Sequence, residues 1–104
     1  MKGRVEIDED SPILNISVAA DILGLHVRTL MLYEYEKLVI PQRNKLNYRL
    51  YSQKQIKHIQ FIQYLTRKKG LNFAGVRMVI TMLKKSDEKG FDLRKEMFPD
   101  FKEN

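Results

Sequence analysis

The fold of this chain is decided by residues 17–36, which read SVAADILGLHVRTLMLYEYE. Apolar residues recur at helical spacing over residues 18–23, and Gly24 then supplies the positive φ that a tight turn needs. A second short helix is predicted to follow at once, over about residues 27–36. Two short helices joined by a turn that contains glycine form the helix-turn-helix pattern, whose second helix lies in the major groove of DNA.

The second helix carries the side chains that are expected to read DNA. Arg28 and Thr29 lie near its N-terminal end, where base edges come within reach, whereas Leu30 faces inward. The alternative for Arg28 is a solvated helix arginine. Tyr33 is in register with Leu30, so it either packs in the core or contacts phosphate. Ser17 is predicted to cap the first helix, with a phosphate contact as its alternative.

The sequence changes from helix to hairpin over residues 38–51. An apolar run at 38–40 is followed by Pro41, which bars further helix. The next segment, QRNKLNYRLY at 42–51, has a polar, turn-prone middle and an end that suits a strand. We therefore predict a two-stranded hairpin with basic residues around its tip, which is a wing.

The wing supplies a second group of candidate contacts. Arg43 and Arg49 flank the tip and are expected to contact phosphate. One of Tyr48 and Tyr51 alternates toward the core, and the sequence leaves open which. The full set predicted to contact DNA is Ser17, His26, Val27, Arg28, Thr29, Tyr33, Arg43, Asn47, Tyr48, Arg49, Tyr51 and Lys54.

A third and a fourth helix are predicted after the wing. Ser52, with Gln55 three residues on, forms a capping box that opens a helix to about Lys69. Lys54, near the start of this helix, either contacts phosphate or faces solvent. Asn72 is predicted to cap the fourth helix. Apolar stripes mark the inward faces: Ile56, Ile59, Ile62 and Leu65 in the third helix, and Val76, Val79, Ile80 and Leu83 in the fourth.

Positive charge is concentrated in the middle of the chain. Between His26 and Lys69, ten basic residues stand against two acidic ones, Glu34 and Glu36. The rest of the chain carries a net charge of −2 within a total of +6. A basic centre is typical of a surface that binds phosphate, although a solvated basic face gives the same pattern.

Composition argues against several classes of function. The 104 residues contain no cysteine, which removes disulfides and thiolate metal sites and suits a cytoplasmic protein. With two histidines and no paired carboxylates, catalytic triad or glycine-rich phosphate loop, we expect no enzyme activity, no metal and no cofactor. We also expect no membrane span, no secretory signal and a single domain without room for an effector-binding domain.

The tail over residues 86–104 is unusually rich in apolar side chains for a chain end. Gly90 and Pro99 interrupt any long helix there. The tail either folds back on the third and fourth helices, where it completes the core or an interface between two copies, or docks on a partner protein as a short peptide. The candidate partner-binding residues are Phe91, Met97, Phe98 and Phe101.

Several motifs occur together at the spacings of one known family. They are ISVAA at 16–20, Gly24-Leu25, Thr29-Leu30, Tyr33-Glu34, Leu38-Val39, Pro41, Arg43, YRLY at 48–51 and GLNFAGV at 70–76. Over roughly residues 14–83 the chain resembles the DNA-binding domain of the MerR family, and LNFAGV is most similar to its heat-shock-repressor and nitrogen-regulator subgroups. Met31 stands where the family usually has Arg, and Lys37 where it usually has Gly. The family's DNA sequence preference is therefore not carried over.

The resemblance implies a mainly α fold, a winged helix-turn-helix with a short two-stranded β wing. It also implies a homodimer bound to an inverted repeat in double-stranded promoter DNA. We expect the apolar fourth helix or the tail to join the two subunits. The expected organisation is an N-terminal arm over residues 1–14, the DNA-binding domain over 15–85 and a C-terminal tail over 86–104.

The expected function is that of a sequence-specific transcription regulator in the cytoplasm, associated with the nucleoid. Because no sensor domain is expected, its signal comes either from its own abundance or from another protein, and we favour a second protein docked on the tail. RNA polymerase, an associated regulatory factor and a chaperone are the candidate partners. The alternative is a DNA-architectural or recombination-directionality (excisionase-like) protein, since such proteins also use small winged domains.

Overall fold

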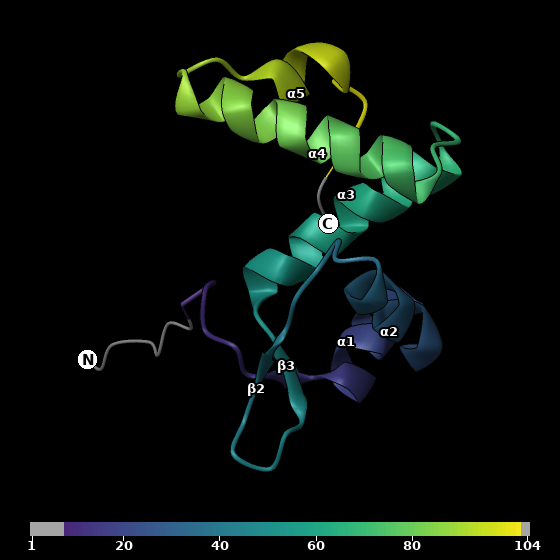
Figure 1. Cartoon of the computed structure of the whole chain (residues 1–104), viewed down its shortest axis with the longest axis vertical. Helices are drawn as coiled ribbons and strands as arrows, with labels where there is room; N and C mark the ends of the chain where they lie inside the picture. The colour runs from purple at the N-terminus through teal and green to yellow at the C-terminus, as the bar shows by residue number, and fades with distance from the viewer. Residues whose placement is uncertain (1–7, 103–104) are drawn as a thin grey trace, which may run out of the picture. The chain divides into compact units, whose positions relative to one another are not determined.

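The computed structural model describes residues 8–102 (Figure 1). The first seven residues of the predicted arm and the last two of the predicted tail lie outside this range. The described chain is mostly helical, as predicted, with a small antiparallel sheet. It divides into two compact units inside helix α3 (Gln53–Arg67), the first ending at Ile59 and the second beginning at Gln60.

The first unit contains the predicted helix-turn-helix. Helix α1 (Ile16–Leu23) and helix α2 (Val27–Tyr35) lie side by side in Figure 1 and are bent by 105° relative to each other. This angle is typical of helix-turn-helix motifs. Gly24, at φ +66°, makes the turn between them, a left-handed conformation that glycine adopts at little cost.

The cap of α1 is Asn15, and the prediction of Ser17 as the cap was wrong. The Asn15 Oδ1 accepts a hydrogen bond from the Val18 amide at 2.9 Å. Asn15 ends strand β1 (Leu14–Asn15), so its backbone is already extended, which is the conformation an N-cap requires. Ser17 is instead the second residue of the helix, and its side chain is exposed.

Helix α2 ends on a left-handed residue that is not glycine. Lys37 has φ +60°. Its amide donates to the Glu34 carbonyl, and the Leu38 amide donates to the Tyr33 carbonyl, both at 2.9 Å. These two hydrogen bonds close the helix in the way a terminal glycine usually does. The chain then turns inward, since Leu38 and Val39 are both buried.

The sheet has three strands, whereas the sequence predicted two. The predicted hairpin is confirmed, with β2 (Gln42–Arg43) antiparallel to β3 (Arg49–Tyr51) and Arg43 opposite Arg49. Strand β1 pairs with the other edge of β3, placing Leu14 opposite Tyr51. A strand of two residues has no detectable alternation, so its pairing could not be read from the sequence.

The core of the first unit is built from helices α1 and α2, the segment after α2, strand β3 and the start of α3. Its buried apolar side chains are Ala19, Ala20, Leu23, Leu30, Tyr33, Leu38, Val39, Tyr51, Ile56 and Ile59. In α1, however, Val18 and Ile22 lie four residues apart on the exposed side of the helix. The apolar periodicity of α1 therefore located the helix, while only part of its apolar surface is buried.

The second unit comprises the rest of α3, helix α4 (Phe73–Glu88) and the short helix α5 (Leu93–Met97). The predicted cap of α4 is confirmed, because the Asn72 Oδ1 accepts from the Gly75 amide at 2.9 Å. Helix α4 extends to Glu88, so the first residues of the predicted tail are helical. The buried apolar side chains of this unit are Phe61, Ile62, Leu65, Val76 and Leu83.

Within residues 8–102, no single helix is both long and apolar enough to cross a membrane. Helices α1 and α2 reach the required length and composition only when taken together, and they are bent at the turn between them.

Candidate nucleic-acid interface

The N-terminal end of α2 presents four of the predicted contact residues together. His26, in the N-cap position, is exposed and makes no capping hydrogen bond through its side chain. Arg28 is also exposed, while Val27 and Thr29 are half-buried. With Met31 these residues line one open pocket of about 690 Å³. Polar and cationic groups are therefore accessible at the end of the helix that reads bases in helix-turn-helix proteins.

Two of the predicted contact residues lie in the core instead. Tyr33 is buried next to Leu30 in the register that the sequence predicted. Tyr51 is only 1% exposed, so of the two wing tyrosines it is the one that faces inward. Burial raises the pKa of the Tyr51 hydroxyl, and the negative charge of Glu34 raises it further. The burial of Tyr33 and Tyr51 is that of packing residues and favours the core alternative that the sequence left open for Tyr33 and for one of the two wing tyrosines.

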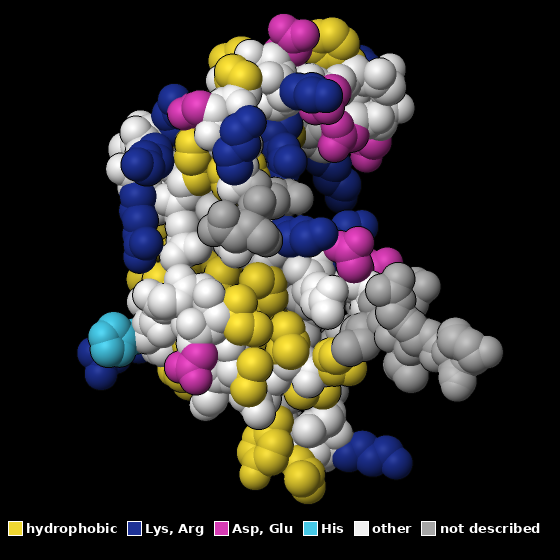
Figure 2. Space-filling view, turned by 180° about the vertical axis from the view of Figure 1, so that it is seen from behind, with side chains coloured by type: hydrophobic (Ala, Val, Ile, Leu, Met, Phe, Trp, Pro, Cys, Tyr) yellow, Lys and Arg dark blue, Asp and Glu magenta, His cyan; other side chains and the backbone are white. Residues whose placement is uncertain are grey.

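The wing tip is a small, internally hydrogen-bonded loop. The Asn44 Oδ1 accepts from the amides of Leu46 and Tyr48 at 2.9 and 3.0 Å. Asn47 has φ +67°, a conformation that asparagine tolerates better than most residues. Leu46 and Tyr48 are 72% and 63% exposed. Figure 2 shows hydrophobic side chains beside a basic one at the lower end of the molecule, where Figure 1 has the hairpin loop.

Glu34 links the recognition helix α2 to both strands of the wing. Its Oε1 accepts from the Arg49 Nε at 2.6 Å, and its Oε2 accepts from the Arg43 Nη2 at 3.1 Å. The hydrogen bond from Arg49 is the main cause that holds the pKa of Glu34 below its ordinary value of 4.5, with partial burial acting in the opposite direction. The carboxylate is therefore charged at neutral pH and is shared by two guanidinium groups.

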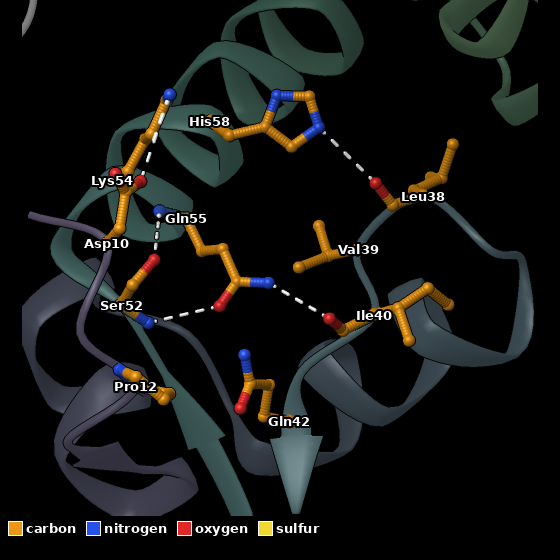
Figure 3. A pocket seen from close by; sticks show the side chains of 10 residues that line it. All are labelled: Asp10, Pro12, Leu38, Val39, Ile40, Gln42, Ser52, Lys54, Gln55 and His58. Atoms are coloured by element: carbon orange, nitrogen blue, oxygen red, sulfur yellow. Dashed lines mark hydrogen bonds and ion pairs between the residues drawn. The ribbon is translucent and has the colours of Figure 1, made fainter.

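A second set of contacts joins α3 to the segment between α2 and the wing (Figure 3). The predicted capping box is confirmed: the Ser52 amide donates to the Gln55 Oε1 at 3.0 Å, and the Gln55 amide donates to the Ser52 Oγ at 3.1 Å. The Gln55 Nε2 also donates to the Ile40 carbonyl at 2.9 Å. These side chains line an open pocket of about 570 Å³. The start of α3 thus holds in place the segment that connects the helix-turn-helix to the wing.

His58 makes the next contact along α3, since its Nε2 lies 3.3 Å from the Leu38 carbonyl oxygen. Partial burial lowers the pKa of His58, and the contact with Leu38 opposes that change. A neutral His58 can donate this hydrogen bond when the proton is on Nε2. His58 therefore supports the same connecting segment.

Comparison with known proteins agrees with this geometry. Residues 14–83 match the family described as MerR HTH family regulatory protein, from strand β1 to the later part of α4. The chain belongs to the MerR family. This confirms the resemblance found in the motifs, and the match covers both the recognition helix and the wing.

This chain is similar in sequence to two kinds of MerR-family protein. A Streptomyces coelicolor protein designated heat shock protein HspR is 39% identical over 86 residues, which cover 79% of this chain and 57% of the relative. The HTH-type transcriptional regulator GlnR of Bacillus anthracis and of Bacillus cereus is 33% identical over 78 residues, which cover 75% of this chain and 60% of the relative. The chain thus spans about three-fifths of the length of the curated relatives it matches.

At the start of α3 in this MerR-family chain, two lysines contact the described part of the arm. The Lys57 Nζ lies 2.8 Å from the Glu9 Oε1, and the Lys54 Nζ lies 3.8 Å from the Asp10 Oδ1. The Lys54 amide also donates to the Glu9 carbonyl at 2.9 Å. The sequence predicted either a phosphate contact or a solvent-facing position for Lys54. Its side chain is exposed and lies next to the acidic Asp10.

In the second unit, the tail residues singled out as candidate partner contacts separate into two pairs. Phe98 and Phe101 pack edge-on against Phe61 of α3, with ring centroids 5.6 and 5.1 Å away. Phe91 and Met97 remain exposed. Part of the tail thus folds back on α3, which was one of the two alternatives, while the exposed pair remains available to another molecule.

Glu34 is the residue of this interface that sequence analysis missed. It was counted as one of two acidic residues in a basic region and as part of the Tyr33-Glu34 motif, without a role of its own. An acidic residue inside a motif of this basic region was the signal that could have identified it. Among residues 8–102 there is no group of three or more His, Cys, Asp or Glu side chains that could hold a metal ion.

Proposed function

We propose that this MerR-family chain binds double-stranded DNA sequence-specifically and regulates transcription. The observation that carries the proposal is the exposed Arg28 at the start of α2, in the same compact unit as a wing that Glu34 ties to that helix. The positive charge of the central region supports a phosphate-binding role. The name of GlnR as a transcriptional regulator supports the regulatory part.

In this proposal the helix reads bases and the wing holds the DNA backbone. Arg28 contacts a guanine through two hydrogen bonds, the commonest specific contact in the major groove. His26, Val27 and Thr29 flank it on the same helix end. The exposed wing residues Asn47 and Tyr48, with Lys54 at the start of α3, contact phosphate and sugar and so set orientation.

Arg43 and Arg49 keep a role in phosphate binding within this proposal, but their ion pairs with Glu34 modify it. Their side chains are partly exposed, so the guanidinium groups remain accessible to a phosphate oxygen while they are held by the carboxylate. The DNA backbone would then meet arginines in fixed positions.

We further propose that two copies bind an inverted repeat in promoter DNA within the cytoplasm. A single winged module buries little DNA surface, whereas a two-fold dimer doubles the contacts and explains palindromic sites. Regulation would reach the dimer through a second protein, such as RNA polymerase, an associated factor or a chaperone. The exposed Phe91 and Met97 of the tail are the candidate contacts for it.

The test of the reading helix is Arg28→Ala, compared with Arg67→Ala. Both variants remove one exposed arginine, but Arg67 lies at the far end of α3 in the other unit. Affinities are measured by fluorescence anisotropy on a preferred duplex and a scrambled duplex at several salt concentrations. Arg28→Ala should cost about 1–3 kcal/mol on the preferred duplex and relax base preference, as loss of a bidentate base contact does.

Arg67→Ala should leave the ratio of the two affinities unchanged. If Arg28→Ala weakens binding to both duplexes equally, Arg28 does not read bases and the proposed mode of binding is wrong.

A map of binding sites along the genome distinguishes transcription regulation from an architectural or recombination role. Sites in promoters support a transcription regulator, whereas sites confined to recombination or attachment sequences support an architectural role.

A further inference from the structure

We infer that Glu34 determines DNA specificity as a positioning residue, by holding the two wing arginines to the recognition helix so that helix and wing engage DNA as one rigid unit. This inference rests on the proposed function. It adds a residue that does not itself contact DNA but acts through Arg43 and Arg49.

The geometry is that of one carboxylate bridging two strands. Each oxygen of Glu34 accepts from a different arginine, Arg49 at 2.6 Å and Arg43 at 3.1 Å. These arginines face each other across the β2–β3 ladder. Glu34 lies near the C-terminal end of α2, six residues after Arg28, which corresponds to about 9 Å along the helix at 1.5 Å per residue. The carboxylate thus fixes the wing to the same helix that carries the reading side chain.

Electrostatics favour this bridge. Two arginines directly opposite each other on neighbouring strands repel, which destabilises a short hairpin. Glu34 attracts both guanidinium groups and offsets part of their repulsion, and its side chain is only 22% exposed, so the interaction is less screened than at an open surface. The lowered pKa of Glu34 has the same cause.

The bridge extends to the wing tip through Arg43. While its Nη2 donates to Glu34, its Nη1 donates to the Asn47 carbonyl at 3.0 Å. Asn47 is the left-handed residue of the loop, next to the exposed Tyr48. A continuous path of hydrogen bonds therefore runs from α2 to the loop that is proposed to contact the DNA backbone.

Loss of the carboxylate should therefore affect specific and non-specific binding in opposite directions. Glu34→Gln removes one negative charge, which strengthens phosphate attraction on any DNA. It also frees the arginines and the wing, which removes the fixed geometry that a preferred sequence needs. Affinity should rise on a scrambled duplex and fall on the preferred one, whereas a purely electrostatic role predicts a rise on both.

The experiment compares Glu34→Gln, Glu34→Asp and the control Asp21→Asn. The probes are a duplex selected by the wild-type chain from a random library and a scrambled duplex of equal composition. Asp21 is exposed in α1 of the same unit, so Asp21→Asn makes the same charge change as Glu34→Gln and should strengthen binding to both duplexes alike. The ratio of affinities should fall about tenfold for Glu34→Gln, within the range of coupling in one ion-pair network.

Glu34→Asp keeps the net charge but shortens the side chain, so it cannot reach both arginines in their present positions. It should lower the affinity ratio while leaving binding to the scrambled duplex unchanged. If thermal unfolding shows that Glu34→Gln is not folded, Glu34→Asp alone provides the test. Folded Glu34 variants that keep the wild-type ratio would overturn the inference. If the wild-type chain itself does not discriminate between the duplexes, it is the proposed function that fails.

Discussion

Among single residues, Tyr51 is buried beneath the proposed DNA-binding surface and is expected to act by packing. Its side chain is almost fully buried, and its hydroxyl has no hydrogen-bond partner among the described residues. The hydroxyl lies close enough to Glu34, Arg43 and Arg49 for their charges to affect its pKa. An unsatisfied buried hydroxyl costs free energy, whereas an apolar group of the same shape does not.

Tyr51→Phe should therefore leave the free energy of unfolding unchanged or raise it by up to about 1 kcal/mol. DNA affinity should stay the same on preferred and scrambled duplexes, because the phenylalanine ring keeps the buried packing of the tyrosine ring. Thermal and denaturant unfolding, with anisotropy on both duplexes, check the two parts. The exposed neighbour gives the contrast: Tyr48→Phe should not affect folding but should weaken binding to both duplexes. A loss of DNA affinity in folded Tyr51→Phe would return Tyr51 to the contact residues.

At the level of elements, most local signals were predicted correctly, apart from the cap of α1, whereas pairings between distant segments were not predicted. The turn at Gly24, the capping box of Ser52 with Gln55 and the Asn72 cap each depend on residues within four positions of one another. Strand β1 depends on β3, more than thirty positions away, and the Glu34–Arg49 contact spans fifteen positions. Periodicity and capping rules describe neighbours in sequence, so contacts of that kind lay beyond them.

The end of α2 yields a prediction of its own. Lys37 adopts φ +60°, which costs a residue with a Cβ about 1–2 kcal/mol relative to glycine. Its side chain is exposed, so Lys37→Gly should raise the free energy of unfolding by about 0.5–1 kcal/mol once the greater freedom of glycine in the unfolded chain is counted. Urea unfolding checks this.

Lys45→Gly is the matched control, because it removes the same side chain at an exposed position that lacks a positive φ. Lys45→Gly should not raise the free energy of unfolding. Equal changes in both variants, or a loss of stability in Lys37→Gly, would mean that the left-handed end of α2 carries no strain.

At the scale of the whole molecule, the proposed dimer needs an apolar surface that the isolated chain leaves exposed. Met78 and Met82 lie four residues apart on one face of α4, and both are exposed. Helix α4 was one of the two segments expected to join subunits, the tail being the other. The packing of Phe98 and Phe101 against Phe61 leaves α4 as the stronger candidate.

Met82→Glu should therefore convert a dimer into a monomer in multi-angle light scattering, because a charge placed in an apolar interface is costly to bury. Lys84→Gln lowers the net charge by the same amount on another face of α4 and should remain dimeric. A wild-type chain that is monomeric both alone and on its selected duplex would contradict the dimer, and an unaffected Met82→Glu would exclude this face.

The helix-turn-helix and wing of this MerR-family chain are proposed to bind a particular DNA sequence. Selection of duplexes from a random library with the wild-type chain, followed by sequencing of the bound fraction over successive rounds, tests it most directly. We predict enrichment of one motif with two-fold symmetry. A parallel selection with the Arg28→Ala variant should give a motif whose half-sites no longer discriminate between bases at one position. A bound fraction that stays as random as the starting library would show that the chain does not recognise a sequence, and an identical motif from Arg28→Ala would show that Arg28 does not read bases.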